Sequence, residues 1–203
     1  MKRTNNYAIM TRQAQERFLL YDQRALIRKL NLPADGSFLY PELFGRRYRL
    51  DRETGNLQRQ EGDTWADANT FEEVLTLLDL ICDSREDRHV TGQYLTTQSF
   101  GQQFHQSLVE DKPTAAALAF DKNPEGLKNA CLALGGKPFP GADVGYILPV
   151  FGELTLVLQF WLGDEEFAPR VRYLWDEGAA GYLRYETMYY AIGVLEELLL
   201  PMV

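Results

Sequence analysis

The stretch that decides the fold reads Leu154-Thr-Leu-Val-Leu-Gln-Phe-Trp-Leu-Gly-Asp-Glu-Glu-Phe167. Over its first nine positions, apolar residues alternate with a mixed set, which is typical of a β-strand that buries one face. The segment from Val144 to Val150 has the same β character, and Gly152-Glu153 separates the two as a turn. The sequence therefore predicts an antiparallel hairpin, and the strand from Leu154 to Leu162 should be central in its sheet.

Segments with helical periodicity lie on both sides of this hairpin. Apolar residues recur every three or four positions from about Tyr7 to Leu30. A capping box begins at Thr70, in which the hydroxyl should accept from the amide of Glu73 and the Glu73 carboxylate should reach back. Asn123-Pro124 is the expected start of another helix, and Asp176 the expected cap of the last one. The last helix should bury a stripe of apolar side chains: Tyr182, Tyr185, Tyr189, Ile192, Leu195 and Leu199.

Shorter strands complete the pattern. Leu43 to Leu50 and Asn56 to Gln60 resemble two strands around a turn at Gly55, and Arg170 to Trp175 resembles a third. Strands and helices come in blocks without strict alternation, which favours the α+β class over a parallel α/β sheet. We therefore expect a single α+β domain over residues 1–203, with a mostly antiparallel sheet and helices packed on it.

The charge balance argues against nucleic acid and membrane surfaces as partners. The 203 residues include 21 Lys and Arg against 29 Asp and Glu, which gives a net charge of −8. Such a charge opposes attraction to polyanions and to anionic lipid. A local basic patch is formed by Arg46, Arg47, Arg49 and Arg52, and we interpret it as the solvated face of a hairpin because no aromatic residues interleave with it.

Local sequence patterns indicate the cellular compartment and the role of the two cysteines. Residues 1–6 lack the apolar core of a signal peptide, and no apolar run approaches the roughly 20 residues of a membrane span. A soluble cytoplasmic protein is expected. Cys82 and Cys131 lie in apolar helical patterns without Cys-x-x-Cys spacing, so we expect both to be small buried hydrophobic residues.

Three consecutive carboxylates follow the end of the apolar strand. In a hairpin, the start of the first strand lies beside the end of the second, so Asp143 and Asp164 should share one edge of the sheet. Clustered carboxylates bind divalent cations, or supply an acid or base. The alternative is a solvated edge, in which residues 164–166 form a turn and a cap. Trp161, on the mixed face of the strand, is suited to pack against a ligand or partner, with Arg170 as a counter-charge.

Other catalytic signatures are not found. Neither His89 nor His105 has a partner at the spacing of a zinc site or nucleophilic triad. Gly135-Gly136 follows a helix and lacks the phosphate-binding fingerprints, so it is better explained as a helix stop.

Several short elements of the sequence form a pattern that spans most of the chain. These elements are Phe44-Gly45 with Tyr48, Leu134-Gly135-Gly136, Gly141-x-Asp143, Pro149, Trp161-x-Gly163-Asp164-Glu165-Glu166-Phe167, Leu174-Trp175-Asp176 and Tyr182-Leu183-x-x-Glu186. Together they resemble one bacterial family, the domain-of-unknown-function family three-seven-eight-six (DUF3786). The most specific element is the Trp-x-Gly-Asp-Glu-Glu-Phe run, and Trp175 stands where the family pattern leads us to expect Phe.

The resemblance implies a type of organism and possible partner proteins, but no activity. The family is common in anaerobic bacteria, and some members are joined to cysteine-rich iron-sulfur segments. With two cysteines, this chain cannot supply the four ligands of such a cluster, so iron-sulfur or corrinoid chemistry would come from a partner. Cofactor, metal and catalytic residues are left unassigned.

Two functional hypotheses follow from these patterns. The first is a module that binds a small ligand or a protein. The second is a carboxylate-based hydrolase or lyase that depends on a divalent metal, with His105 as a distant base. The expected binding residues are Asp143, Trp161, Asp164, Glu165, Glu166 and Arg170.

Overall fold

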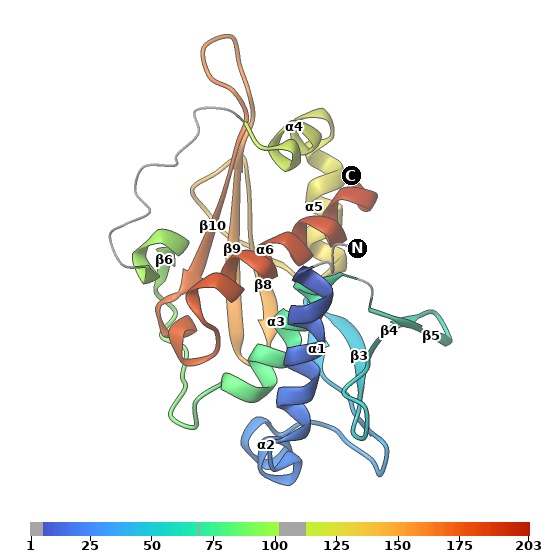
Figure 1. Cartoon of the computed structure of the whole chain (residues 1–203). Coiled ribbons are helices and arrows are strands. Elements are labelled where there is room, and N and C mark those ends of the chain that lie inside the picture. The colour runs from blue at the N-terminus through green and yellow to red at the C-terminus, as the bar shows by residue number, and fades with distance from the viewer. Residues whose placement is uncertain (1–5, 69, 102–112) are drawn as a thin grey trace.

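The structure, a computed structural model, describes residues 6–68, 70–101 and 113–203. In that part of the chain, six α-helices accompany two antiparallel sheets (Figure 1). The α+β class that the sequence predicts is confirmed, with the strands divided between two sheets. His105 lies outside the described residues. None of the described helices combines the length and the apolar character needed to cross a bilayer.

The larger sheet contains the predicted hairpin at its centre. Its strands are β6 (Tyr94–Thr96), β7 (Lys137–Pro138), β8 (Val144–Phe151), β9 (Leu154–Trp161) and β10 (Arg170–Asp176), in the order β6-β10-β9-β8-β7. All neighbours in this sheet run antiparallel. The apolar strand β9 is central, as its sequence predicts: β8 and β10 pair with its backbone on both sides, and most of its side chains are buried.

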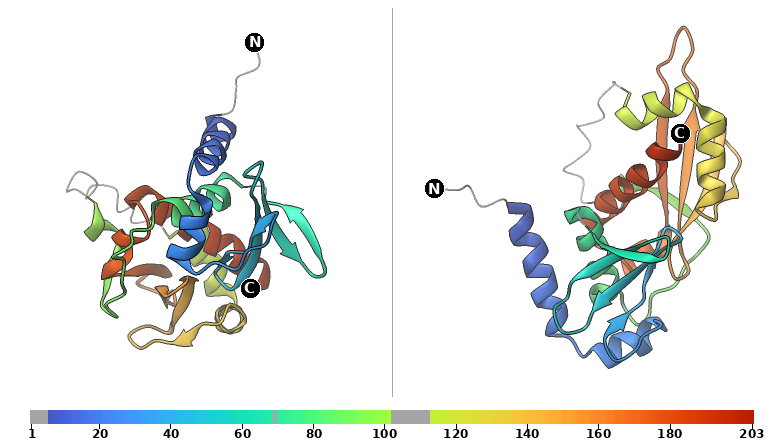
Figure 2. Two further views of the ribbon diagram at one scale, coloured as in Figure 1. Left: turned by 90° about the horizontal axis from the view of Figure 1, so that it is seen from below. Right: turned by 90° about the vertical axis from the view of Figure 1, so that its right-hand side faces the viewer.

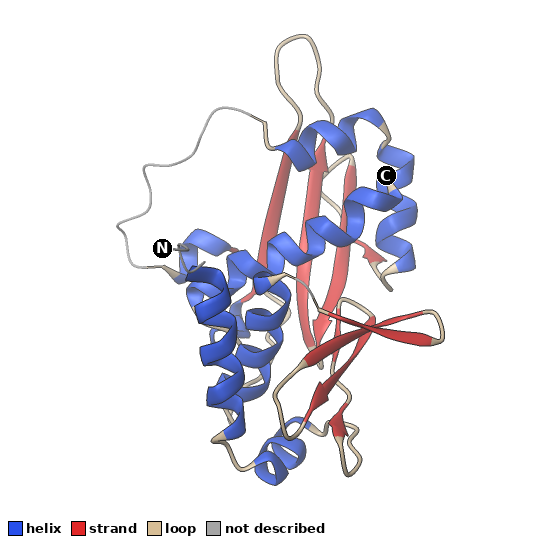
Figure 3. Ribbon diagram, turned by 45° about the vertical axis from the view of Figure 1, so that its right-hand side comes forward, coloured by secondary structure: helices blue, strands red, loops and turns tan. Residues whose placement is uncertain are grey.

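The smaller sheet is built from the hairpin expected around Gly55 and three further strands. It consists of β1 (Phe38–Leu39), β2 (Glu42–Leu43), β3 (Arg46–Asp51), β4 (Leu57–Glu61) and β5 (Thr64–Asp67). The path runs β1-β3-β4-β5, and β2 also pairs with β3. This sheet lies beside the lower end of the larger one in Figure 3.

The N-terminal segment forms two helices where periodicity predicts one. Helix α1 covers Asn6–Leu19 and α2 covers Gln23–Leu30. The break occurs because the Asp22 carboxylate accepts hydrogen bonds from the second and third backbone amides of α2. This cap starts a new helix at a different angle. The first helix projects from the body of the molecule in Figure 2.

Helix α3 (Phe71–Asp83) begins at the predicted cap, but only half of the capping box forms. The Thr70 hydroxyl accepts from the backbone amide of Glu73 at 3.3 Å. The Glu73 side chain does not reach back. It is 2% exposed and accepts from the Tyr48 hydroxyl at 2.7 Å and from Arg59 at 3.0 Å. The glutamate thus joins α3 to the smaller sheet, a role that long-range packing decides.

Three more helices follow along the chain. Helix α4 covers Ala115–Lys122, and α5 covers Pro124–Ala133 with Asn123 as its cap. Helix α6 (Tyr185–Leu199) crosses the larger sheet (Figure 1). Short 3₁₀ turns also occur, namely η1 (Thr97–Phe100), η3 (Glu177–Gly181) and η4 (Leu200–Met202).

The sequence places the start of the last helix too early. Asp176 caps η3, where it accepts from the Gly178 amide, and α6 begins only after Arg184. Tyr189, expected in the buried stripe, is 43% exposed. Packing against α3 and the sheet selects a neighbouring face of the helix, which buries Thr187, Met188, Ala191, Val194, Leu195, Leu198 and Leu199.

A tight turn joins the two sheets. The Phe44 amide donates to the Val150 carbonyl of β8 at 3.0 Å, and Gly45 follows with a φ of +72°. A β-carbon at Gly45 would lie 3.3 Å from the Leu134 carbonyl oxygen at the end of α5, so only glycine fits without strain. One continuous cluster of buried apolar residues extends across this junction.

Helix α6 carries a half-buried carboxylate, Glu196, whose charge should weaken the fold at neutral pH. Burial raises the pKa of Glu196 above its usual range, and a hydrogen bond from the Tyr173 hydroxyl at 2.8 Å opposes this only in part. The pKa of Glu196 is higher in the folded protein than in the unfolded protein. The contribution of the neutral carboxyl to the free energy of unfolding is therefore fully present below the pKa of the unfolded state. It is lost as the pH rises through the pKa of the folded state.

We therefore expect Glu196→Gln to be more stable than the wild type at pH 7–8. Well below pH 4, where the wild-type carboxyl is neutral in both the folded and the unfolded protein, the two proteins should be equally stable. Urea unfolding between pH 3 and 8 measures the difference. A difference that does not change with pH would contradict the charge explanation.

Candidate functional site

The candidate site lies on the loop of residues 162–169, which joins β9 to β10. This loop projects beyond the end of the larger sheet, next to α4 (Figures 1 and 2). Its two ends are fixed by the strands, because Trp161 and Arg170 are paired in register at the last rung of the β-ladder. The expected residues 164–166 therefore lie at a protruding tip.

Two carboxylates from other segments hold the base of the loop. Asp143, which precedes β8, accepts from the Leu162 amide through Oδ2 at 2.9 Å. Asp121 of α4 accepts from the Gly163 amide through Oδ1 at 2.9 Å. The amides of Leu162 and Gly163 lie just after β9, and both bonds supply them with acceptors. These two bonds fix the direction in which the chain leaves the sheet.

A third carboxylate organises the tip itself. Asp164 Oδ1 accepts from the amides of Glu166 at 2.8 Å and Phe167 at 2.7 Å, and the Asp164 amide donates to the Phe167 carbonyl at 2.9 Å. These bonds form a compact Asx turn. A β-carbon at Gly163 would lie 2.8 Å from the Pro169 ring, so the two sides of the loop are closely packed.

The structure places Asp143 and Asp164 at the same end of the hairpin, but their carboxylates bind different backbone amides. Each carboxylate binds backbone amides of the loop, and within the described residues no hydrogen bond joins the two side chains. In the same part of the chain, no group of three or more His, Cys, Asp or Glu residues is arranged to hold a metal ion. The acids thus orient the loop.

The held loop displays apolar and acidic side chains to solvent. Phe167 is 69% exposed and Leu162 is 44% exposed. Glu165 and Glu166 are exposed beside them. Phenylalanine is among the residue types most often buried, and here it is exposed together with Leu162 on a hydrogen-bonded turn.

Trp161 lies at the foot of the loop beside arginine. The Arg172 guanidinium carbon is 5.2 Å from the centroid of the Trp161 ring, and the exposed Arg170 is the direct register partner of Trp161. Sequence reasoning expected acids next to Trp161 and missed Arg172. Strand alternation places Arg170 and Arg172 on one face, but only the β9–β10 register brings that face to the tryptophan. Asp121 was also missed, because no local pattern links it to residue 163.

A cavity occurs elsewhere in the described structure. Its volume is about 330 Å³, and it is lined by Ala25, Arg28, Lys29 and Glu86. Lys29 is committed to α3, because its ammonium donates to the Ser84 carbonyl at 2.6 Å. None of the expected site residues lines this cavity.

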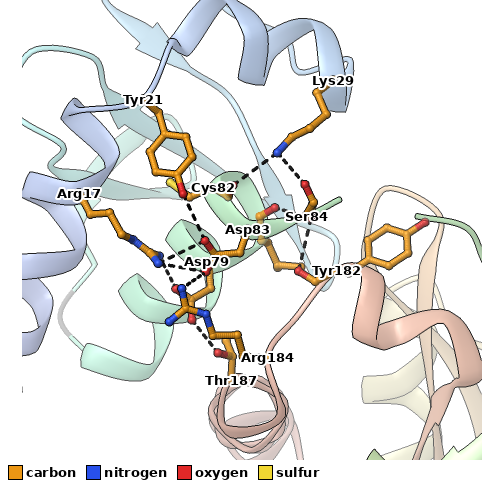
Figure 4. Close-up of polar contacts among 11 residues, drawn as sticks. Arg17, Tyr21, Lys29, Asp79, Cys82, Asp83, Ser84, Tyr182, Arg184 and Thr187 are labelled. Atoms are coloured by element: carbon orange, nitrogen blue, oxygen red, sulfur yellow. Dashed lines mark hydrogen bonds and ion pairs between the residues drawn. The ribbon is translucent and has the colours of Figure 1, made fainter. Parts of the chain in front are cut away.

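A dense polar cluster joins α1, α3 and α6 (Figure 4). Arg17 binds both Asp79 and Asp83, and Arg184 also pairs with Asp83. Thr187 donates to the second oxygen of Asp79 at 2.6 Å. Since the carboxylates are paired within the protein, we interpret the cluster as a connection between helices.

Both cysteines are buried and unpaired, as predicted. Burial raises the pKa of Cys82 to about 12 and that of Cys131 to about 12. The thiolate form that metal ligation and nucleophilic attack require is therefore disfavoured at both positions.

Comparison with known proteins identifies one family. The model of the family described as "Domain of unknown function (DUF3786)" matches residues 22–197. Helix α1 precedes the matched region. No significant match is found among curated proteins or among solved structures.

Proposed function

The chain belongs to the DUF3786 family, and we propose that it is a protein-binding module that docks through the loop 162–169. The observation that carries this proposal is the exposed Phe167 on a turn fixed by three carboxylates. A loop that is already ordered loses little conformational entropy on binding, and this raises affinity. We further infer that residues 1–203 act as one domain, since the core cluster continues across both sheets.

The chemistry of the loop defines the partner surface that would recognise it. Phe167 and Leu162 would enter an apolar depression, because large apolar side chains supply most of the energy at interface centres. Glu165 and Glu166 would face basic side chains at its rim. The partner is therefore a protein with a basic-rimmed apolar pocket, and its association should slow as salt concentration rises.

The family resemblance adds a finer element to this proposal. Both cysteines are buried on helices, so a cluster or corrinoid would belong to the partner. We include an iron-sulfur or corrinoid protein as the partner class to test first.

A protein partner is favoured over a small ligand by the shape of the site. Small molecules bind in concave sites that cover most of their surface. The loop is convex, and the described cavity is lined by residues of another region. The metal-dependent hydrolase hypothesis gains no support from Asp143 and Asp164, because their carboxylates hold backbone amides.

Site-specific photocrosslinking in the native bacterial cell tests the proposal. A photoreactive phenylalanine analogue at position 167 should give one discrete adduct that purified wild-type protein competes away. The same analogue at Leu132, which is 52% exposed on α5, serves as the matched control. The competitor Phe167→Ala should lose at least about tenfold in potency, since truncating an interface anchor costs 2 kcal/mol or more. Equal adducts at positions 167 and 132, or equal competition by Phe167→Ala, would contradict the docking role.

A further inference from the structure

The smaller sheet carries a mixed aromatic and basic surface on its outer face. In β3, Tyr48 and Leu50 are buried, so Arg47 and Arg49 point to the opposite side. Arg52 is used within the protein, because Nη1 donates to the Asp35 carbonyl at 2.6 Å. The arginines of the hairpin, all expected from the sequence to be solvated, therefore have different surroundings.

Arg49 is flanked by aromatic rings from other strands. Its guanidinium carbon lies 4.6 Å from the centroid of Phe38 in β1 and 4.9 Å from that of Trp65 in β5. Strand β1 adjoins β3 on one side, and β5 lies beyond β4 on the other. The aromatic interleaving that is missing from the local sequence is therefore supplied by the sheet.

Hydrogen bonds fix the orientation of the same guanidinium. Arg49 Nε donates to Gln58 Oε1 at 2.7 Å, and Gln58 Nε2 donates to Asp67 Oδ1 at 2.9 Å. The Nη1 and Nη2 groups have no hydrogen-bond acceptor among the described residues. The protein thus orients an arginine and leaves its two-pronged edge open, which matches a carboxylate in bidentate geometry.

We propose that Arg49 is a receptor for a carboxylate on an acidic peptide of a second, different protein. The peptide's apolar carbons would pack against Phe38, Trp65 and Tyr40, whose ring lies 6.3 Å from each of the other two. An extended peptide suits this open face, because an enclosing cavity is not needed. The site is independent of the loop 162–169.

Charges near the site are compatible with an anionic ligand. Arg47 is exposed on the same face and adds a second positive charge, although Glu42 lies opposite it in register. Asp67 is occupied by side-chain amides, and Asp51 accepts from backbone amides of its turn at 2.8 and 2.9 Å. A second copy of the chain is a poorer occupant, because a loop-to-sheet contact between copies is heterologous and need not close.

Nuclear magnetic resonance of the full chain tests the assignment. The probe is acetyl-Glu-Glu-Asp-Tyr-amide, an acidic sequence that does not occur in this chain, and the matched neutral control is acetyl-Gln-Gln-Asn-Tyr-amide. The acidic peptide should shift the Trp65 indole signal and leave the buried Trp175 signal unchanged. Arg49→Lys, which keeps the charge and loses the fork, should bind about tenfold more weakly, whereas Arg47→Lys should stay within about twofold. Gln58→Ala, which frees Nε, should also weaken binding if Arg49→Lys fails to fold.

Three results would overturn the assignment. The first is equal binding of the acidic and neutral peptides. The second is an equal loss in Arg49→Lys and Arg47→Lys, which would indicate charge without geometry. The third is self-association of the wild type, seen in analytical ultracentrifugation as an average mass that rises with protein concentration, together with a lower mass for Phe167→Ala. That result would identify a second copy of the chain as the occupant. Peptide binding that persists in Phe167→Ala separates this site from the proposed docking loop.

Discussion

Asp176→Ala is expected to lower the free energy of unfolding by about 2–4 kcal/mol, because three backbone amides lose one buried carboxylate acceptor at once. The carboxylate is 1% exposed. It accepts from the amides of Thr91 at 3.0 Å, Gly92 at 2.8 Å and Gly178 at 2.8 Å. One side chain thus joins the end of β10 to a segment more than 80 positions earlier. Its loss should loosen both β6 and η3.

Urea unfolding monitored by tryptophan fluorescence measures this loss. Asp176→Asn should be intermediate, because one acceptor oxygen remains. Asp35→Ala is the matched control, since Asp35 also accepts from two backbone amides, at 2.7 Å each, but is exposed to water. Its loss should be much smaller, because water replaces the acceptor. Comparable losses for Asp176→Ala and Asp35→Ala would refute the role of burial.

Arg17→Met should lower the free energy of unfolding by about 2–3 kcal/mol, because it leaves the buried Asp79 carboxylate without its counter-charge, whereas Asp83 keeps Arg184. Arg17 donates to Asp83 at 3.0 Å and is ion-paired with Asp79, which is almost completely buried (Figure 4). The arginine side chain is itself partly exposed, so the expected loss lies below that of a fully buried pair. Met retains most of the aliphatic packing.

The same variant should release α1 from the rest of the fold. This helix buries only Ala14 and Phe18 in the core and lies outside the family match. Hydrogen exchange should therefore show faster exchange in α1 before the sheets are affected. Arg12→Met, on an exposed position of the same helix, is the control. The double variant with Asp79→Asn should lose less than the sum of the single changes, and strict additivity would argue against a direct Arg17–Asp79 coupling.

Features that depend on neighbouring residues could be predicted from the sequence. The hairpin of β8 and β9, the Thr70 cap and the Asn123 cap each rest on hydrogen bonds or alternation within a few residues. The failures concern where helices break or begin, as at Asp22 and Arg184. At these positions, alternative helix ends have similar local free energies, and tertiary packing decides which of them forms.

The candidate site shows the same division. The acidic tip could be located, because a strand followed by consecutive carboxylates signals an exposed turn. Its stabilisation by Asp121 could not be predicted, since that contact joins positions 42 residues apart. Likewise, the Glu73 carboxylate was expected to cap its own helix, and it binds Tyr48 and Arg59 instead.

By itself, the sequence determined the α+β class, the central strand and the family, because alternation, caps and short motifs are local. Only the tertiary structure turned Asp143 and Asp164 into supports of a loop that exposes Phe167. It alone placed Arg49 between rings from separate strands. The physical reason is that strand register and inter-element packing decide which distant side chains meet, and small differences in burial free energy that no short segment encodes set both.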